Sequence, residues 1–475
     1  MKNGVYSDVQ KKRTLYGGRS MSDNRDFLGT EPIGSLLRRL ALPTVAAQII
    51  NMLYNIVDRI YIGHIPGDGV LALTGVGVCM PLIMIVTAFA AFAASGGAPR
   101  ASIFMGKGDK ESAEKTLGNC LTLQIIISVI LTVVLLVYSR PVLLLFGASE
   151  NTIGYATSYM NLYALGTVFV QVTLGMNAFI TAQGFAKEGM FSVLIGAIAN
   201  ILLDPVFIFL FHMGVRGAAL ATIVSQALSC LWVCTFLCGE STHLKIKRKY
   251  MKMENGIVLP VLALGLATFT MQASESVISF CFNSSLARYG GDIAVGAMTI
   301  LTSVMQFAML PLQGLGQGAQ PIISYNYGAK NADRVKAAFR LLLKCNLCYS
   351  VTLWLLVMIF PQVFAGLFTA DPTLLAYTKP ALRIYLACLG LFGIQLACQM
   401  TFTSLGKALD SIVVAVMRKF ILLIPLIYLM PRLFPENRAM AVYLAEPAAD
   451  FFAILFTSIL FTSEFKRALK KMRQE

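Results

Sequence analysis

Apolar segments of about 20 residues or more recur along nearly the whole chain of 475 residues. Each is long enough for a helix to cross roughly 30 Å of hydrocarbon. Charged residues make up only 13% of the sequence, too few to cover a soluble protein of this length. Alternating strand patterns are absent. The sequence predicts an all-α polytopic membrane protein with about twelve spans, at 40–62, 70–97, 117–138, 155–181, 190–211, 217–238, 257–283, 293–316, 341–365, 380–404, 411–431 and 440–462.

The net charge of +15 could suggest nucleic acid, but its distribution argues against that partner. If the N-terminus is cytoplasmic and twelve spans alternate, most Lys and Arg residues fall on the cytoplasmic side, with clusters at 245–252 and 464–475. We therefore expect a multi-pass membrane protein with cytoplasmic termini, contacts to membrane lipid and no nucleic-acid partner. Residues 1–35 lack an apolar core, so no cleaved signal peptide is expected, and Met1 or Met21 could be the start.

The chain contains an internal repeat. Leu42-Pro43 and Leu259-Pro260 open the first and seventh spans, and beyond them glycines, prolines and tyrosines match at a constant offset of 222 residues, as in Gly106 and Gly328. Six spans is an even number, so the halves are expected to be parallel, a common plan of secondary transporters. The predicted parts are a cytoplasmic tail (1–35), an N-lobe (36–240), a cytoplasmic linker (241–256), a C-lobe (257–463) and a basic cytoplasmic tail (464–475).

Ionisable and amide side chains interrupt four of the predicted spans. A charged residue at a helix centre costs about 2.5–3.5 kcal/mol on insertion scales, so such residues usually face water or one another. Polar residues three or four apart share one helix face. These stripes contain Asn51, Asn55 and Asp58 in the first span, Asn200 and Asp204 in the fifth, Thr222 in the sixth, and Gln272 and Glu275 in the seventh. Pro205 is expected to kink the fifth span beside Asp204.

The repeat shows that the halves are chemically unequal. Asp58 and Glu275 each lie fifteen residues after the proline that opens their half, so they are equivalent. Asn200 and Asp204, by contrast, correspond to Leu422 and Leu426. A coupling site confined to the first half would produce this asymmetry.

Three kinds of chemistry fit these acids. Burial disfavours an ionised carboxylate, so the acids could take up and release a proton. The oxygens of Asp58, Asn200, Asp204 and Thr222 could instead hold Na+, or a carboxylate could pair with a cationic substrate. Each acid could also serve a structural hydrogen-bond network, which is the favoured reading for Glu446 and Asp450. Arg418 and Lys419 are expected to snorkel to the cytoplasmic surface.

Several motifs resemble those of the multidrug and toxic compound extrusion (MATE) family. They are YNIVDRIYIGH (54–64), NILLDPVFIF (200–209) followed by GVRGAALATIVSQ (214–226), and YNYGAKN (325–331). The order of motifs and the repeat match the family from about residue 30 onward, and the nearest branch is that of the bacterial exporters of the MepA type. The resemblance implies two six-helix bundles around a central cleft. It also implies export of cationic, amphipathic drugs and dyes across a bacterial plasma membrane by antiport with H+ or Na+, without a further cofactor. Nothing in the sequence demands more than a monomer.

The resemblance also assigns roles to residues. It places Asp58, Asn200, Asp204, Thr222 and Glu275 in ion coupling or substrate binding, with Asn51, Tyr54, Asn55, Gln272 and Gln395 as secondary candidates. Some family members carry an aspartate on the tenth helix, where this chain has Ile394 or Gln395. That departure disfavours a sodium site on helices seven to ten and favours the first-bundle site.

Three other functions fit the sequence less well. A flippase for lipid-linked precursors would need basic residues in its cavity, whereas the charges within the spans are mainly acidic. A polytopic membrane enzyme would need a nucleophile with its base, or metal ligands, yet none of the three histidines lies in a predicted span. A channel would show passive, uncoupled flux.

Overall fold

The computed structural model describes residues 27–67, 69–369 and 371–474, and every regular element in these ranges is helical. Within these ranges, nine helices are long and apolar enough to cross a membrane. Two bent pairs of shorter helices complete two more spans, with bends of 56° and 48°. The 74-residue helix α10 is divided at Gly291, whose backbone (φ 63°, ψ −160°) is not helical. Counting α10 as two spans gives twelve, which confirms the predicted fold class.

The first six spans form one lobe and the last six form the other. The N-lobe consists of α3 (Ile33–Gly63), α4 (Gly69–Gly106), α5 (Lys110–Leu145), the bent pair α6 (Ile153–Leu165) and α7 (Thr167–Ala182), α8 (Ala186–Pro205) with η1 (Val206–Leu210), and α9 (Val215–Cys238). The C-lobe consists of α10 (Asn255–Gly328), α11 (Ala332–Ile359), α12 (Pro361–Gly366), the bent pair α13 (Pro372–Tyr385) and α14 (Leu389–Ser404), α15 (Ala408–Val416) with η3 (Met417–Leu423) and α16 (Ile424–Leu433), and α17 (Arg438–Gln474). Short helices α2 (Phe27–Thr30), η2 (Arg248–Tyr250) and η4 (Pro435–Asn437) lie at the ends of spans.

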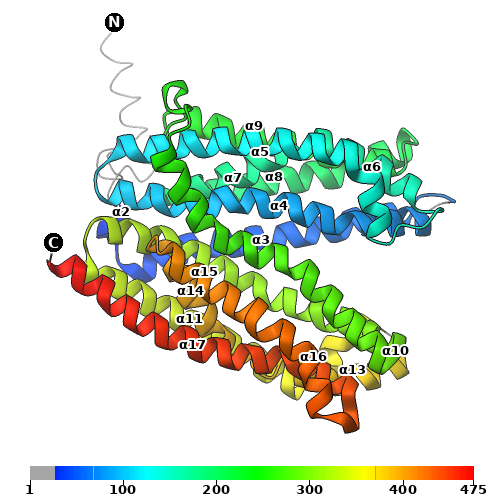
Figure 1. Ribbon diagram of the computed structural model, residues 1–475. Coiled ribbons are helices and arrows are strands. Elements are labelled where there is room, and N and C mark those ends of the chain that lie inside the picture. The colour runs from blue at the N-terminus through cyan, green and yellow to red at the C-terminus, as the bar shows by residue number, and fades with distance from the viewer. Residues whose placement is uncertain (1–26, 68, 370, 475) are drawn as a thin grey trace, which may run out of the picture.

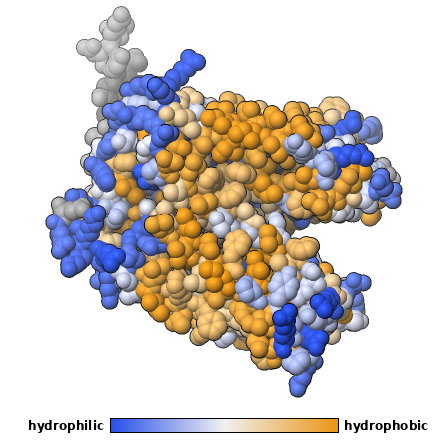
Figure 2. Space-filling view, viewed as in Figure 1, coloured by the Kyte–Doolittle hydropathy of each residue, from blue (hydrophilic) through white to orange (hydrophobic). Residues whose placement is uncertain are grey.

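The two lobes are arranged as a V. They meet at the end of the molecule that holds α2 and the end of α17, and they diverge toward the opposite end (Figure 1). Figure 2 shows a broad hydrophobic band across both lobes, hydrophilic surfaces at the two ends, and a hollow between the diverging arms. The band is the surface that a bilayer would cover. The hollow is the cleft that opens away from α2.

Glycines allow the lobes to meet closely where the V closes. A Cβ atom on Gly106 of α4 would lie 1.9 Å from the carbonyl oxygen of Tyr325, and one on Gly328 of α10 would lie 2.0 Å from that of Ile103. The repeat offset of 222 relates residue 103 to 325 and residue 106 to 328. The two contacts are therefore the same contact with the halves exchanged, as parallel repeats related by a two-fold axis require.

Helix α3 crosses the seam between the lobes. The Thr44 hydroxyl donates to the carbonyl oxygen of Gly314 at 2.7 Å, and the Gln48 amide donates to the side-chain oxygen of Gln317 at 3.1 Å. Both acceptors lie on the second half of α10. Beyond these contacts α3 continues along the N-lobe with its polar stripe, which ends at Asp58.

Candidate functional site

Three of the predicted site residues come together in the N-lobe. Asp58 comes from α3, while Asn200 and Asp204 lie one turn apart on α8. The Asn200 amide donates to Asp204 Oδ1 at 3.2 Å, and the carboxyl of Asp58 interacts directly with that of Asp204. Asp204 is 0% exposed. Two neighbouring carboxyls in such a place repel each other when both are ionised.

Three side-chain oxygen atoms of the same group do not form a hydrogen bond to any described residue. In the described part of the chain, Asp58 Oδ1, Asn200 Oδ1 and Asp204 Oδ2 are buried without a hydrogen-bond partner. Buried polar atoms are nearly always paired, because leaving them unpaired costs free energy. A proton shared between the carboxyls, or a cation held by the three oxygens, would satisfy them.

Thr222 joins this group through a tyrosine that the sequence analysis did not single out. The Tyr159 side chain on α6 lies near the Thr222 side chain and within electrostatic range of Asp58. Tyr159 stacks on Tyr163 with ring centroids 6.3 Å apart, and Tyr163 lies near Tyr54 of α3. The repeat held a signal for this tyrosine cluster, since Tyr163 corresponds to Tyr385, which lies beside the C-lobe acids.

Pro205 explains the backbone next to Asp204. Proline has no amide hydrogen, so the carbonyl of Ile201 loses its ordinary helical donor. Helix α8 ends at Pro205 and continues as the π-helical turn η1. The expected disruption of this span is therefore present, one residue after the most deeply buried acid of the N-lobe.

The fifth predicted site residue, Glu275, belongs to a separate cluster in the C-lobe. Its carboxylate accepts a hydrogen bond from the Lys419 ammonium at 2.7 Å. The Glu275 side chain is 56% exposed although protein surrounds it on most sides, whereas Lys419 is 6% exposed. Glu275 thus lies on a concave surface with a buried cation behind it, apart from the N-lobe aspartates.

The expectation that Arg418 and Lys419 snorkel to the surface is wrong. Both lie on the π-helical segment η3 and are buried. Arg418 donates to Asp450 at 2.6 Å and to Glu446 at 2.9 Å, and its guanidinium stacks over Phe392. Two carboxylates buried four residues apart on α17 need a positive charge beside them. Arg418 supplies that charge, so its guanidinium remains inside the lobe instead of extending to the surface. Glu446 and Asp450 therefore have the structural partner that their favoured reading required.

Tyr54 lies beside Asp58, and the other secondary candidates are dispersed. Asn51 and Gln272 are exposed, and the Asn55 amide donates to the carbonyl oxygen of Asn51 at 2.6 Å. Gln395 of α14 is 3% exposed, and neither polar atom of its side chain has a partner among the described residues. Gln395 is thus a buried polar residue of the C-lobe, outside the N-lobe group.

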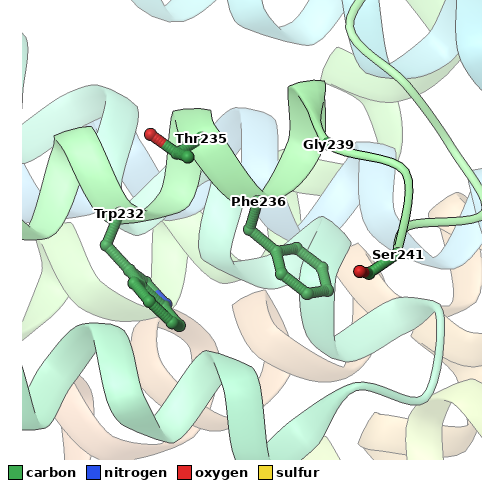
Figure 3. Close-up of a pocket in the computed structure, with 5 residues that line it drawn as sticks. All are labelled: Trp232, Thr235, Phe236, Gly239 and Ser241. Carbon is green, nitrogen blue, oxygen red and sulfur yellow. The ribbon is translucent and has the colours of Figure 1, made fainter. Parts of the chain in front are cut away.

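A small hollow elsewhere on the surface has different chemistry. Its volume is about 200 Å³, and it is lined by Trp232, Thr235, Phe236, Gly239 and Ser241 (Figure 3). None of these residues is charged. Trp232 lies ten residues beyond Thr222 on α9, about 15 Å along the helix axis. The hollow is therefore separate from the N-lobe acids.

The fold and the N-lobe acids define a class: two-lobed, twelve-span membrane proteins with buried ionisable groups inside a lobe. The sequence profile of the MatE family matches residues 43–206 and 267–429, one copy in each half. The chain belongs to the MatE family.

Individual relatives are distant in sequence and close in fold. Multidrug export protein MepA of Staphylococcus haemolyticus (strain JCSC1435) is 23% identical over 91% of this chain and 95% of its own. MepA of Staphylococcus aureus (strain N315) is 23% identical over 86% and 89%. A crystal structure of MATE in the bent conformation superposes with a TM-score of 0.88 at 22% identity, covering 94% of this chain and 99% of its own. An outward-facing MATE family transporter superposes with a TM-score of 0.87 at 22% identity, covering 95% and 99%.

Proposed function

We propose that this protein is a secondary multidrug exporter that moves cationic, amphipathic molecules out of the cell in exchange for H+ or Na+. The main support is the group of Asp58, Asn200 and Asp204, in which three buried oxygen atoms have no hydrogen-bond partner among the described residues. Membership of the MatE family supports the transport function, and the names of the MepA relatives support the cargo.

The geometry suggests how exchange would work. The paired aspartates carry their full negative charge only when no cation is bound, so binding a proton or Na+ at this pair stabilises it. A cationic cargo is attracted to the same charge and is released when the ion neutralises it. Such exchange requires the two cleft orientations to bind each ligand with different affinity.

The orientation of the protein in the membrane follows from charge. Basic residues at 245–252 and 464–474 lie at the closed end of the V, as the positive-inside rule expects for the cytoplasmic side. The cleft of this conformation would then open outward, the state in which cargo leaves and the ion enters. The bacterial plasma membrane and a monomeric state belong to the same proposal.

The sign of the unpaired buried charges favours a cationic cargo over a phosphate-bearing lipid. In the C-lobe, Arg418 and Lys419 could bind a phosphate, but both are buried and already form ion pairs with acids. Asp58 and Asp204 have no ion-pair partner among the described residues. The N-lobe acid group therefore offers a ligand negative charge.

The test is dye transport by the full chain in proteoliposomes, with a proton or a sodium gradient imposed separately. A cationic fluorescent dye should move faster under one of the gradients. Asp58→Asn and Asp204→Asn should each reduce that acceleration at least tenfold. Asp292→Asn, which changes an exposed residue next to the α10 kink, is the matched control and should transport normally.

Two results would count against the proposal. Normal gradient-driven transport by both aspartate variants would remove the N-lobe mechanism. Absence of transport of any cationic dye under either gradient would remove the multidrug assignment, and lipid-linked substrates would be tested next.

A further inference from the structure

The short helix α2 lies at the closed end of the V, between the two lobes (Figure 1). It precedes α3 in the chain and is separated from it by Glu31 and Pro32. Its four residues are too few to be stable as an isolated helix. Its conformation must therefore be maintained by the two lobes that it contacts.

The C-lobe binds α2 through backbone carbonyls. Arg334 Nη2 donates to the carbonyl oxygen of Leu28 at 3.1 Å and to that of Glu31 at 2.7 Å, while its Nε donates to Asn326 Oδ1 at 2.9 Å. The Asn326 amide also donates to Leu28, at 2.9 Å. A guanidinium is well placed here, because the last carbonyls of a helix lack donors and carry partial negative charge. These residues include and adjoin the YNYGAKN motif.

The N-lobe binds α2 through an aromatic ring. Phe27 is 4% exposed, and a Cβ atom on Gly184 would lie 2.3 Å from the end of its ring. Gly184 (φ +90°) forms the turn between α7 and α8, so the ring occupies space that only glycine leaves open. The guanidinium of Arg39 lies over the same ring at 4.8 Å.

We infer that residues 27–31 form a latch that stabilises closure of the lobes at this end. Gly184 belongs to one lobe, and Asn326 and Arg334 belong to the other. Any opening of the cleft on this side separates them, so the latch must then release at least one of its two attachments. The inference rests on the proposed function only in that both cleft orientations occur in the working protein.

The experiment measures the separation of the lobes directly. Lys187 on α8 and Ala337 on α11 are both exposed near the closed end. Spin labels at these two positions report the distance between the lobes by pulsed electron paramagnetic resonance. They are attached through a non-canonical amino acid, because the chain has ten cysteines of its own. The sample is the full chain in lipid nanodiscs.

Arg334→Ala and Phe27→Ala should each raise the fraction of molecules with the longer distance at least threefold. The double variant should add little to either single variant, because one released attachment already opens the latch. Arg340→Ala removes an exposed Arg from the same helix and should leave the distances unchanged. Arg334→Lys keeps the charge but loses the forked donor geometry, and it should give an intermediate fraction.

Unchanged distances in both single variants, with folded and monodisperse protein, would overturn the latch. Independent, additive effects would do so as well, because they would indicate two unrelated packing contacts. If Arg334→Ala does not fold, the comparison of Phe27→Ala with Arg334→Lys decides in the same way. Failure of dye transport in the wild-type chain would contradict the proposed function, while the distances would still decide on the latch.

Discussion

Single residues give the acid groups of the two lobes different electrostatic surroundings. In the C-lobe, Arg418 and Lys419 already supply positive charge to Glu275, Glu446 and Asp450. The equivalent places of the two bases in the N-lobe are Gly196 and Ala197, which carry no charge. Among the described residues, the N-lobe aspartates are thus left without an ion-pair partner. A mobile ion is consequently expected to act in the N-lobe.

The two C-lobe bases should differ in their importance for stability. Arg418→Met leaves two neighbouring buried acids unpaired, and breaking a buried pair in this way costs about 3–5 kcal/mol. Lys419→Met leaves only Glu275 unpaired, and water in the cleft can solvate that half-exposed carboxylate. Arg418→Met should therefore lower the Tm of the purified protein at least twice as far as Lys419→Met does.

Charge-matched variants check the reason for that difference. Adding Glu446→Gln and Asp450→Asn to Arg418→Met should recover much of the lost Tm, since the unpaired charges are then removed. Arg340→Met, on the exposed face of α11, should have no measurable effect. Equal Tm values for Arg418→Met and Lys419→Met would contradict the account.

At the scale of elements, the repeat extends to the first turn of equivalent helices. Asp109 caps α5 by accepting a hydrogen bond from the Ser112 amide, and Asn331 caps α11 by accepting one from the Arg334 amide. The offset of 222 relates these two caps to each other. Only the N-lobe cap can titrate. The hydrogen bonds from Ser112 hold the pKa of Asp109 below its usual range.

The Asp109 cap should therefore contribute stability that depends on pH. Because its pKa is lower in the folded protein, the contribution is present above the pKa of an unfolded aspartate, about 3.9, and is lost as pH falls through the folded value. Asp109→Ala should cost about 1 kcal/mol near neutral pH and progressively less in acid. Thermal unfolding across pH checks this, with Asn331→Ala as a control whose effect should not vary with pH. An Asp109→Ala deficit that stays constant into acid would contradict it.

The sequence was sufficient to predict the elements but not their ends or bends. All twelve apolar segments coincide with spans, because crossing a bilayer requires a long apolar helix. The structure extends α4 to Gly106 and starts α5 at Lys110, well beyond the predicted 70–97 and 117–138. The extra turns at 110–116 are charged, and the extension of α4 beyond 97 begins with Pro99 and Arg100, so a search for uninterrupted apolar segments excludes both. The bend at Gly166 between α6 and α7 was not predicted, since a glycine alone does not determine a kink.

The candidate site was predictable to the extent that it follows helix periodicity. Spacing alone predicted that Asn200 and Asp204 would share a face, and their hydrogen bond confirms it. Contacts between helices were not predictable in the same way, because they depend on how each helix is rotated against its neighbours. Tyr159 and the pairing of Lys419 with Glu275 are of this kind.

At the scale of the whole molecule, the glycine contacts determine how closely the lobes meet. A Cβ atom on Gly265 of α10 would lie 1.8 Å from the carbonyl oxygen of Phe92, and one on Gly96 of α4 would lie 1.9 Å from that of Val261. Together with Gly106 and Gly328, they bring α4 and α10 into backbone contact along the closed part of the V. The sequence does not reveal the direction in which the cleft opens, since the same twelve helices can close at either end.

Gly106→Ala and Gly328→Ala should each force the lobes apart at the closed end, because a methyl group there meets the backbone of the other lobe rather than a flexible side chain. Each should lengthen the distance between labels at Lys187 and Ala337 and reduce gradient-driven dye transport at least tenfold. The two glycines are equivalent by the repeat, so their effects should be alike. Gly77→Ala is the matched control on α4, because a Cβ atom there meets nothing within 4 Å. If the seam variants transport dye as the Gly77→Ala control does, close contact between these helices is not required for the cycle.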